Sequence, residues 1–115
     1  MKQQRVYLND ILKRIEQIEH FTEDGRKKFL ESDLIQEAVM RCFEVIGESV
    51  KRLDSSLKAK YTHIQWRDYT GFRDVLIHQY DKIQLEVVWD AVENDLDPLK
   101  KGVQYLLESM PDTEE

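Results

Sequence analysis

The sequence has 115 residues, of which 41% are apolar and 35% are charged, which suits one compact domain over residues 1–115 with a buried core. Its formal net charge of −6 argues against an evenly basic nucleic-acid-binding surface, because Lys and Arg are the residues that neutralise phosphates. The single cysteine, Cys42, excludes a disulfide framework and favours a cytoplasmic location. No run of residues approaches the ~20 apolar positions that span a bilayer, so we expect no membrane association.

The charge is unevenly distributed along the chain. The net charge is −2 over residues 1–50, +3 over residues 51–82 and −7 over residues 83–115. Salt screens exposed charges from one another beyond ~8–10 Å, so a basic patch can bind phosphate on an acidic protein. The middle segment is therefore the candidate for an anionic partner.

The first half of the sequence predicts two amphipathic helices. Residues 3–20 carry apolar side chains at three- and four-residue steps, namely Val6, Leu8, Ile11, Leu12, Ile15 and Ile18. A break follows at Gly25, and Ser32 with Asp33 is suited to cap a long helix that runs to Leu53 with an apolar stripe starting at Leu34. Gly47 costs this helix ~1 kcal/mol relative to alanine, which close helix packing or access to a site would explain.

The second half predicts further helices. Residues 54–65 form a polar connector, residues 66–79 a short helix, and the apolar stripes of residues 85–107 one or two more, with Asp97 and Pro98 at a helix cap and first turn. Trp66 and Trp89 are expected to be buried anchors. We therefore predict an all-α protein, an antiparallel bundle of four to five helices.

The stretch RDVLIHQY, residues 73–80, gathers four reactive side chains in the basic segment. On a helix, Arg67, Gly71, Asp74 and His78 fall on one line, because they are four, three and four residues apart. Asp74 is then expected to contact His78 and to orient its imidazole. Arg73 and Tyr80 fall on a second line, roughly 100–140° away.

This divergence suggests that a second copy of the chain completes a site. If two such helices met across a twofold axis, Gly71 would allow close backbone approach and Arg73 and His78 of both copies would line one cleft. An arginine and a histidine suit RNA cleavage by the 2′-hydroxyl, in which histidine moves protons and guanidinium stabilises charge on phosphorus. The plain alternative is a hydrogen-bonded structural histidine.

Other polar residues leave alternatives open. His20 and His63 share no ligand spacing with His78, so we expect no metal site. Lys51 and Arg52, together with Arg67, are candidate RNA-binding residues, and Lys58 and Lys60 also carry charge near them. These cations either guide RNA toward the cleft or solvate the end of a helix.

The stretches WRDYTGFRDVLIHQY and LEVVWDAVENDL resemble the HEPN superfamily, and specifically its HepT-type toxins. The motif of that family is an arginine, four residues, a histidine, one residue and a tyrosine, which matches Arg73, His78 and Tyr80. The polar Asp74 directly follows the arginine. The stretches SDLIQEAVMR and EVIGESVKRL resemble the second helix of the family, so the resemblance covers nearly the whole chain.

The resemblance implies a HEPN-like bundle that dimerises through the motif helix and acts as a metal-independent endoribonuclease without a cofactor. It implies the toxin of a type VII toxin–antitoxin system, with Arg73 and His78 catalytic and Asp74 assisting. Tyr80 would be AMPylated by an MntA-type nucleotidyltransferase antitoxin, with which the homodimer could form a higher oligomer. The added AMP would inactivate the cleft by charge and bulk. The alternative is a non-catalytic HEPN module that binds a nucleotidyltransferase or a nucleotide.

Overall fold

The computed structural model describes residues 2–111, and the predicted all-α fold is confirmed for them, because no strand occurs in this range. The elements are α1 (Lys2–Phe21), α2 (Arg26–Glu31), α3 (Asp33–Arg52), α4 (Ser55–Lys58), α5 (Trp66–His78), the 3₁₀ helix η1 (Tyr80–Lys82), α6 (Leu85–Asn94) and α7 (Leu96–Glu108). Five of them, α1, α3, α5, α6 and α7, correspond to the helices expected from the sequence. The short helices α2, α4 and η1 lie in the connections between them.

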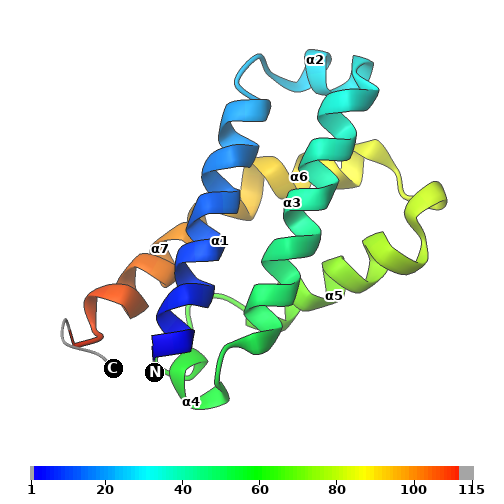
Figure 1. Ribbon diagram of the computed structural model, residues 1–115. Coiled ribbons are helices and arrows are strands. Elements are labelled where there is room, and N and C mark those ends of the chain that lie inside the picture. The colour runs from blue at the N-terminus through cyan, green and yellow to red at the C-terminus, as the bar shows by residue number, and fades with distance from the viewer. Residues whose placement is uncertain (1, 112–115) are drawn as a thin grey trace.

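Helices α1 and α3 lie side by side and run in opposite directions, joined by α2 at one end (Figure 1). Each packs an unbroken apolar stripe against the other, and both stripes are fully or almost fully buried: Leu8, Ile11, Ile15 and Ile18 from α1, and Val39, Phe43, Ile46 and Val50 from α3. Val6 and Leu34 were expected in these stripes but are 52% and 80% exposed. At 100° per residue, both point more than a right angle away from the buried stripe of their helix.

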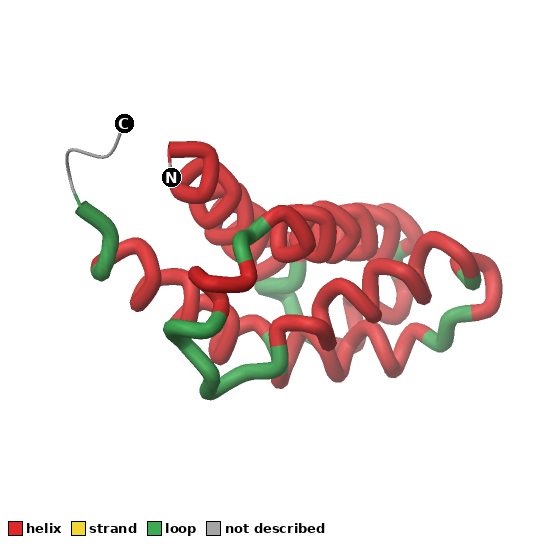
Figure 2. The backbone as a smooth tube through the Cα atoms, turned by 90° about the horizontal axis from the view of Figure 1, so that it is seen from below, coloured by secondary structure: helices red, strands yellow, loops and turns green. Residues whose placement is uncertain are grey.

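The other helices pack around this pair. Helix α5 packs against α3, and α7 packs against α1. Helix α6 contacts α2 and α7 and crosses behind α1 and α3 (Figures 1 and 2). Trp66 and Trp89 are 8% and 6% exposed, which confirms their predicted role as buried anchors.

Several helix ends were predicted correctly and others were not. Ser32 caps α3, since its side-chain oxygen accepts a hydrogen bond from the backbone N–H of Ile35 at 3.2 Å. The connector over residues 54–65 was expected to be irregular, but it contains α4. Helix α7 begins at Leu96, so Asp97 and Pro98 both lie in its first turn and the cap position belongs to Asp95.

The extent of the domain stays a prediction, since residues 1 and 112–115 lie outside the described range. Over residues 2–111, no helix is both long and apolar enough to cross a membrane.

Candidate functional site

Gly47 lets α5 approach α3 closely. A Cβ atom at Gly47 would lie 2.8 Å from the carbonyl oxygen of Tyr69 and would collide with the Cβ atom of Arg73. Real Cβ atoms do not make such contacts, so only glycine fits without a shift of α5. The close helix packing that the sequence suggested for Gly47 is therefore confirmed, and this packing also fixes the position of Arg73 on α5.

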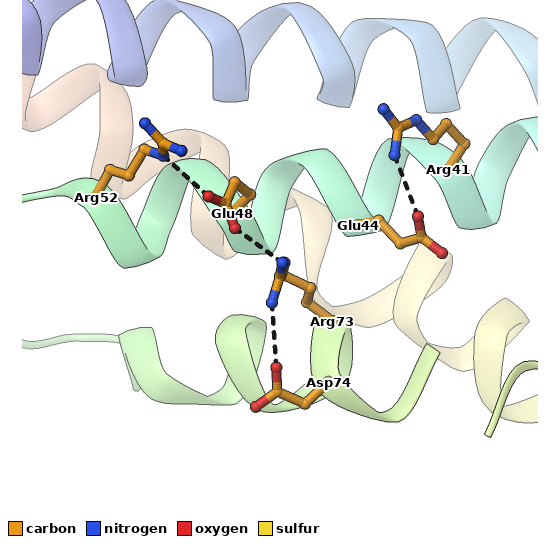
Figure 3. A network of polar contacts seen from close by, with 6 residues as sticks. All are labelled: Arg41, Glu44, Glu48, Arg52, Arg73 and Asp74. Atoms are coloured by element: carbon orange, nitrogen blue, oxygen red, sulfur yellow. Dashed lines mark hydrogen bonds and ion pairs between the residues drawn. The ribbon is translucent and has the colours of Figure 1, made fainter. Parts of the chain in front are cut away.

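The guanidinium of Arg73 points toward α3 and is held there by a carboxylate (Figure 3). Its Nη2 atom lies 3.0 Å from Oε1 of Glu48, and its Nη1 atom lies 3.3 Å from Oδ1 of Asp74. The side chain of Arg73 is only 23% exposed. A guanidinium has five N–H donors, so donors remain for a substrate after both contacts are made.

Glu48 is itself oriented by a second arginine. Nε of Arg52 donates a hydrogen bond of 2.9 Å to Oε2 of Glu48 (Figure 3). This hydrogen bond, aided by the positive charge of Arg73, lowers the pKa of Glu48 from its usual value. Glu48 is therefore ionised near neutral pH and fixes the direction of Arg73.

A shallow cavity of about 200 Å³ lies beside Arg73 in the groove between α3 and α5. Its walls are Arg41, Glu44, Val45, Glu48, Arg73 and Ile77. Arg41 and Glu44 form a further ion pair, with Nη1 and Oε1 3.3 Å apart. The groove therefore carries charges of both signs, most of them neutralised by a neighbour.

His78 is the last residue of α5 and is exposed. It lies on the side of the helix opposite the fully buried Leu76, in line with the exposed residues Arg67, Gly71 and Asp74. The sequence predicted a contact between Asp74 and His78, and this contact is not formed: in the described part of the chain, the carboxylate of Asp74 pairs with Arg73 instead.

Arg73 and His78 therefore face different surroundings on one helix. Five residues at 100° each leave the two side chains about 140° apart. Arg73 turns inward to α3, whereas His78 turns outward. The site that would combine the two groups is thus incomplete within one chain.

Tyr80 lies beyond the end of α5, in η1, so the expected helical line from Arg73 to Tyr80 is not formed. Its side chain turns back toward α3, where the phenol hydroxyl donates a hydrogen bond to Oε2 of Glu37. Tyr80 is still 43% exposed. The side chain of Tyr80 is therefore partly open to solvent, with its hydroxyl beside a carboxylate that is able to accept its proton.

The three candidate RNA-binding residues differ in their surroundings. Lys51 and Arg67 are exposed, and Arg67 lies in the first turn of α5. Arg52 is also exposed, but its guanidinium is paired with Glu48. Arg52 therefore acts on Arg73 through Glu48, in addition to any contact with a ligand.

Sequence reasoning missed the acidic residues of α3 that contact the motif. Glu37, Arg41, Glu44 and Glu48 are spaced by four, three and four residues, so they form one polar line along the helix. The line lies on nearly the opposite side of α3 from the stripe of Val39, Phe43, Ile46 and Val50, and Gly47 directly precedes Glu48. This spacing and the helical glycine were the signals available in the sequence.

Comparisons with known proteins identify the family of this chain. The family model HepT-like, described as "Ribonuclease HepT-like", matches residues 11–106. A protein of Thermococcus cleftensis named "Probable ribonuclease HepT" is 38% identical over 101 residues, which cover 87% of this chain and 92% of that protein. A "Putative RNase" of Methanocaldococcus jannaschii is 35% identical over 107 residues, or 92% of each chain.

In another relative, the region that matches this chain is part of a longer protein. This "Gamma-glutamylcyclotransferase and putative RNase" of Methanocaldococcus jannaschii is 37% identical over 110 residues, and the match covers 95% of this chain but only 50% of the relative. No solved structure matches the chain. The family match over most of the sequence, together with the Arg73, His78 and Tyr80 motif on α5 and η1, shows that the chain belongs to the HepT-like ribonuclease family of the HEPN superfamily.

Proposed function

We propose that this protein is a metal-independent endoribonuclease whose site forms where the α5 helices of two copies meet. The observation that carries the proposal is the arrangement of Arg73 and His78 on α5. Arg73 is held in place by Glu48 at 3.0 Å, and His78 stands on the open face of the same helix. Membership of the HepT-like family supports RNA as the substrate.

The open face of α5 supports pairing with a second copy. No atom lies within 4 Å of a Cβ built on Gly71, so the backbone there is free to approach another helix. Val75 and Ile77 nearby are 39% and 43% exposed. They lie on opposite flanks of this face, about 160° apart around the helix, so a second α5 packed at Gly71 would cover at most one of them. Such packing would bring His78 of one copy toward Arg73 of the other.

The two side chains have complementary roles in the proposed reaction. The 2′-hydroxyl oxygen attacks phosphorus and forms the O2′–P bond, while an imidazole of His78 takes the hydroxyl proton. The P–O5′ bond breaks, and the proton held by the same His78 passes to the leaving oxygen, directly or through water. Arg73 donates hydrogen bonds to the phosphoryl oxygens as negative charge builds on them. The products are a 2′,3′-cyclic phosphate and a free 5′-hydroxyl.

RNA cleavage in the presence of EDTA tests this proposal. The purified protein should cleave RNA, and His78→Ala and Arg73→Ala should each reduce the rate by about 100-fold or more. Lys28→Ala, which removes an exposed cation on the distant helix α2, is the matched control and should cleave at the parent rate. Equal cleavage by all four proteins would indicate a contaminating nuclease and would contradict the assignment.

We also propose that the protein is the toxin of a type VII toxin–antitoxin pair, controlled by AMPylation of Tyr80. The partner would be an MntA-type nucleotidyltransferase, and Tyr80 is suited to it because its side chain is exposed and its hydroxyl is hydrogen-bonded to Glu37. The phenol oxygen would attack the α-phosphorus of ATP, pyrophosphate would leave, and the carboxylate of Glu37 would accept the proton. The AMP phosphate would then place a negative charge close to the groove that holds Arg73.

Intact-mass measurement after co-expression with such an antitoxin tests this second proposal. One adenylate mass should appear on the parent and be absent from Tyr80→Phe, which keeps the ring but lacks the nucleophile. Adenylate retained on Tyr80→Phe would remove Tyr80 as the site.

The alternative function is a non-catalytic interaction module. The exposed apolar side chains Val75 and Ile77 on α5 favour it as much as they favour dimerisation. Absence of cleavage by the parent, together with a stable complex with the nucleotidyltransferase, would establish this alternative.

A further inference from the structure

A second cavity lies at the opposite end of α5 from His78. It has a volume of about 510 Å³ and is lined by Ser55, Lys58, Tyr61, Thr62, Ile64, Gln65, Trp66 and Arg67. These residues come from α4, the connector that follows it and the first turn of α5. We refer to it as the 58–67 cavity.

The charge of the 58–67 cavity sets it apart from the groove at Arg73. No acidic residue lines it, whereas it has two cationic side chains, Lys58 and Arg67. Within residues 2–111, neither of them forms an ion pair, although Arg41, Arg52 and Arg73 all do. Nζ of Lys58 donates one hydrogen bond to the carbonyl of Val50 at 3.4 Å, which leaves further donors available. An unneutralised pair of cations of this kind favours an anionic ligand.

An aromatic cluster adjoins the same cavity through Tyr61, which lines it. The centroid of the Tyr61 ring lies 5.1 Å from that of His63, with the two rings edge-on at 69°, and 5.4 Å from that of Tyr105, with the two rings tilted by 43°. His63 is exposed and Tyr105 is 51% exposed. Exposed aromatic faces beside cations are the combination by which proteins bind single-stranded nucleic acids.

Tyr61 is held in place by its neighbours. A Cβ atom on Gly102 of α7 would lie 2.9 Å from the ring of Tyr61, so the absence of a side chain there makes room for the ring. Nε1 of Trp66 donates a hydrogen bond of 2.9 Å to the carbonyl of Tyr61, which ties the connector to α5. Tyr61 is therefore fixed against α7 and α5, next to the exposed side chain of Tyr105.

We propose that the 58–67 cavity and the exposed Tyr105 beside its wall form a binding subsite for single-stranded RNA that flanks the cleaved bond. Lys58 and Arg67 bind backbone phosphates, and Tyr105 stacks on an unpaired base. Arg67 lies eleven residues before His78 on one face of α5, a separation of about 16 Å, so a short strand can reach both. The inference deepens the proposed ribonuclease function and rests on it for the identity of the ligand.

Fluorescence anisotropy with a labelled single-stranded RNA tests the subsite separately from cleavage. All proteins carry His78→Ala, so that the RNA is not cut during the measurement. Lys58→Gln and Arg67→Gln should each weaken binding about 5-fold at 0.1 M salt and reduce the slope of log K against log salt by about 0.7, the value for one lost phosphate contact. Lys28→Gln on α2 should change neither quantity.

The aromatic contribution has its own pair of variants. Tyr105→Ala should weaken binding about 5-fold or more, whereas Tyr105→Phe keeps the stacking face and should bind like the parent. A duplex RNA of equal length should bind more weakly than the single strand, because its bases are not free to stack. Thermal melting of each variant checks that the fold is retained.

Several outcomes would overturn the proposed subsite, and one would separate it from the proposed ribonuclease function. The subsite is wrong if the parent does not bind RNA, if the cavity variants bind like the parent, or if Lys28→Gln weakens binding equally. Equal binding of duplex RNA would also overturn the assigned ligand class. If binding follows the expected pattern but the unmutated protein does not cleave RNA, the subsite stands and the ribonuclease proposal fails.

Discussion

The two halves of α5 are held in different ways. In the first half, Trp66 is 8% exposed, and its Nε1 donates a hydrogen bond to the carbonyl of Tyr61. The hydroxyl of Tyr69 donates a hydrogen bond of 2.8 Å to the backbone carbonyl of Asp95. Close contact with Gly47 then fixes the helix at Arg73. In the second half, Leu76 is fully buried, but Val75, Ile77 and His78 are exposed.

This difference suggests a division of roles along the helix. A guanidinium that stabilises charge is most effective when it is already oriented, since no reorganisation is then needed during the reaction. A histidine that must reach a substrate between two copies has to remain on the surface until they meet. In the proposed site, Arg73 is therefore preorganised within one chain, and His78 would be positioned by a second copy.

Replacing the glycine that brings the helices together should have the largest effect on this arrangement. In Gly47→Ala, the new Cβ collides with Arg73, so α5 must shift and we expect a loss of about 1–3 kcal/mol in the free energy of unfolding. A displacement of Arg73 by about 1 Å should lower RNA cleavage by about 100-fold. Urea unfolding and cleavage assays measure the two effects.

Gly71→Ala, the same substitution at an open position of α5, is the matched control. Its Cβ meets no atom of the chain, and alanine favours a helix over glycine by about 1 kcal/mol, so the monomer should become more stable. If α5 pairs through Gly71, sedimentation should show a weaker dimer. A destabilised monomer would contradict the open environment of Gly71.

Removing the charge that orients Arg73 should have an intermediate effect. Glu48→Gln should reduce cleavage about 10-fold, because one charge-assisted hydrogen bond to Arg73 is weakened. Glu44→Gln, on the same line of α3 but paired with Arg41, should leave cleavage near the parent rate. Equal losses in both variants would mean that general charge, and not the orientation of Arg73, controls the rate.

The pH dependence of stability separates the role of Glu48 from a general loss of structure. Because the folded state lowers the pKa of Glu48, its pairing stabilises the fold above the ordinary value of 4.5 and is lost as pH falls through the lowered pKa. The difference in Tm between the parent and Glu48→Gln should therefore be present at pH 7 and vanish in acid. A constant difference across this range would contradict the pairing.

Loosening the anchored half of α5 should have a smaller effect. Tyr69→Phe removes the hydrogen bond to Asp95 and should cost about 1 kcal/mol in the free energy of unfolding. Burial raises the pKa of Tyr69, so its contribution is present below the ordinary pKa of 10.0 and is lost as pH rises above it. Calorimetry at pH 8 and pH 11 should show a smaller difference from the parent at the higher pH.

Asp74→Asn should have the smallest effect. The carboxylate is 63% exposed and pairs with the adjacent Arg73 instead of His78, and exposed ion pairs contribute about 0–1 kcal/mol. Cleavage should fall less than about 5-fold, the factor that 1 kcal/mol gives. A loss as large as that of His78→Ala would show that Asp74 acts directly on the substrate or on the histidine.

The helices and the motif could be predicted from the sequence because they depend on local patterns. Apolar spacing located α1 and α3, and the order of Arg73, His78 and Tyr80 suggested the family. The partners of these residues could not be predicted, since Glu48 and Glu37 reach them only through the packing register of α3 against α5. That register is set by tertiary contacts, for which the polar spacing on α3 and the helical Gly47 were the signals available in the sequence.

Two local expectations failed for identifiable physical reasons. Asp74 was expected to contact His78 one turn away, but the neighbouring guanidinium of Arg73 is a stronger partner for a carboxylate. Tyr80 was expected in line with Arg73 on one helix, but α5 ends at His78 and η1 turns the tyrosine toward Glu37.

Cleavage by mixed dimers tests most directly whether Arg73 of one chain works with His78 of another. Arg73→Ala and His78→Ala proteins, each inactive alone, are unfolded together, refolded and assayed on RNA with EDTA present. The mixed dimer keeps one site with Arg73 from one chain and His78 from its partner, so the mixture should regain a substantial part of the parent activity. A mixture as inactive as its components, although mass spectrometry shows mixed dimers, would contradict the shared site.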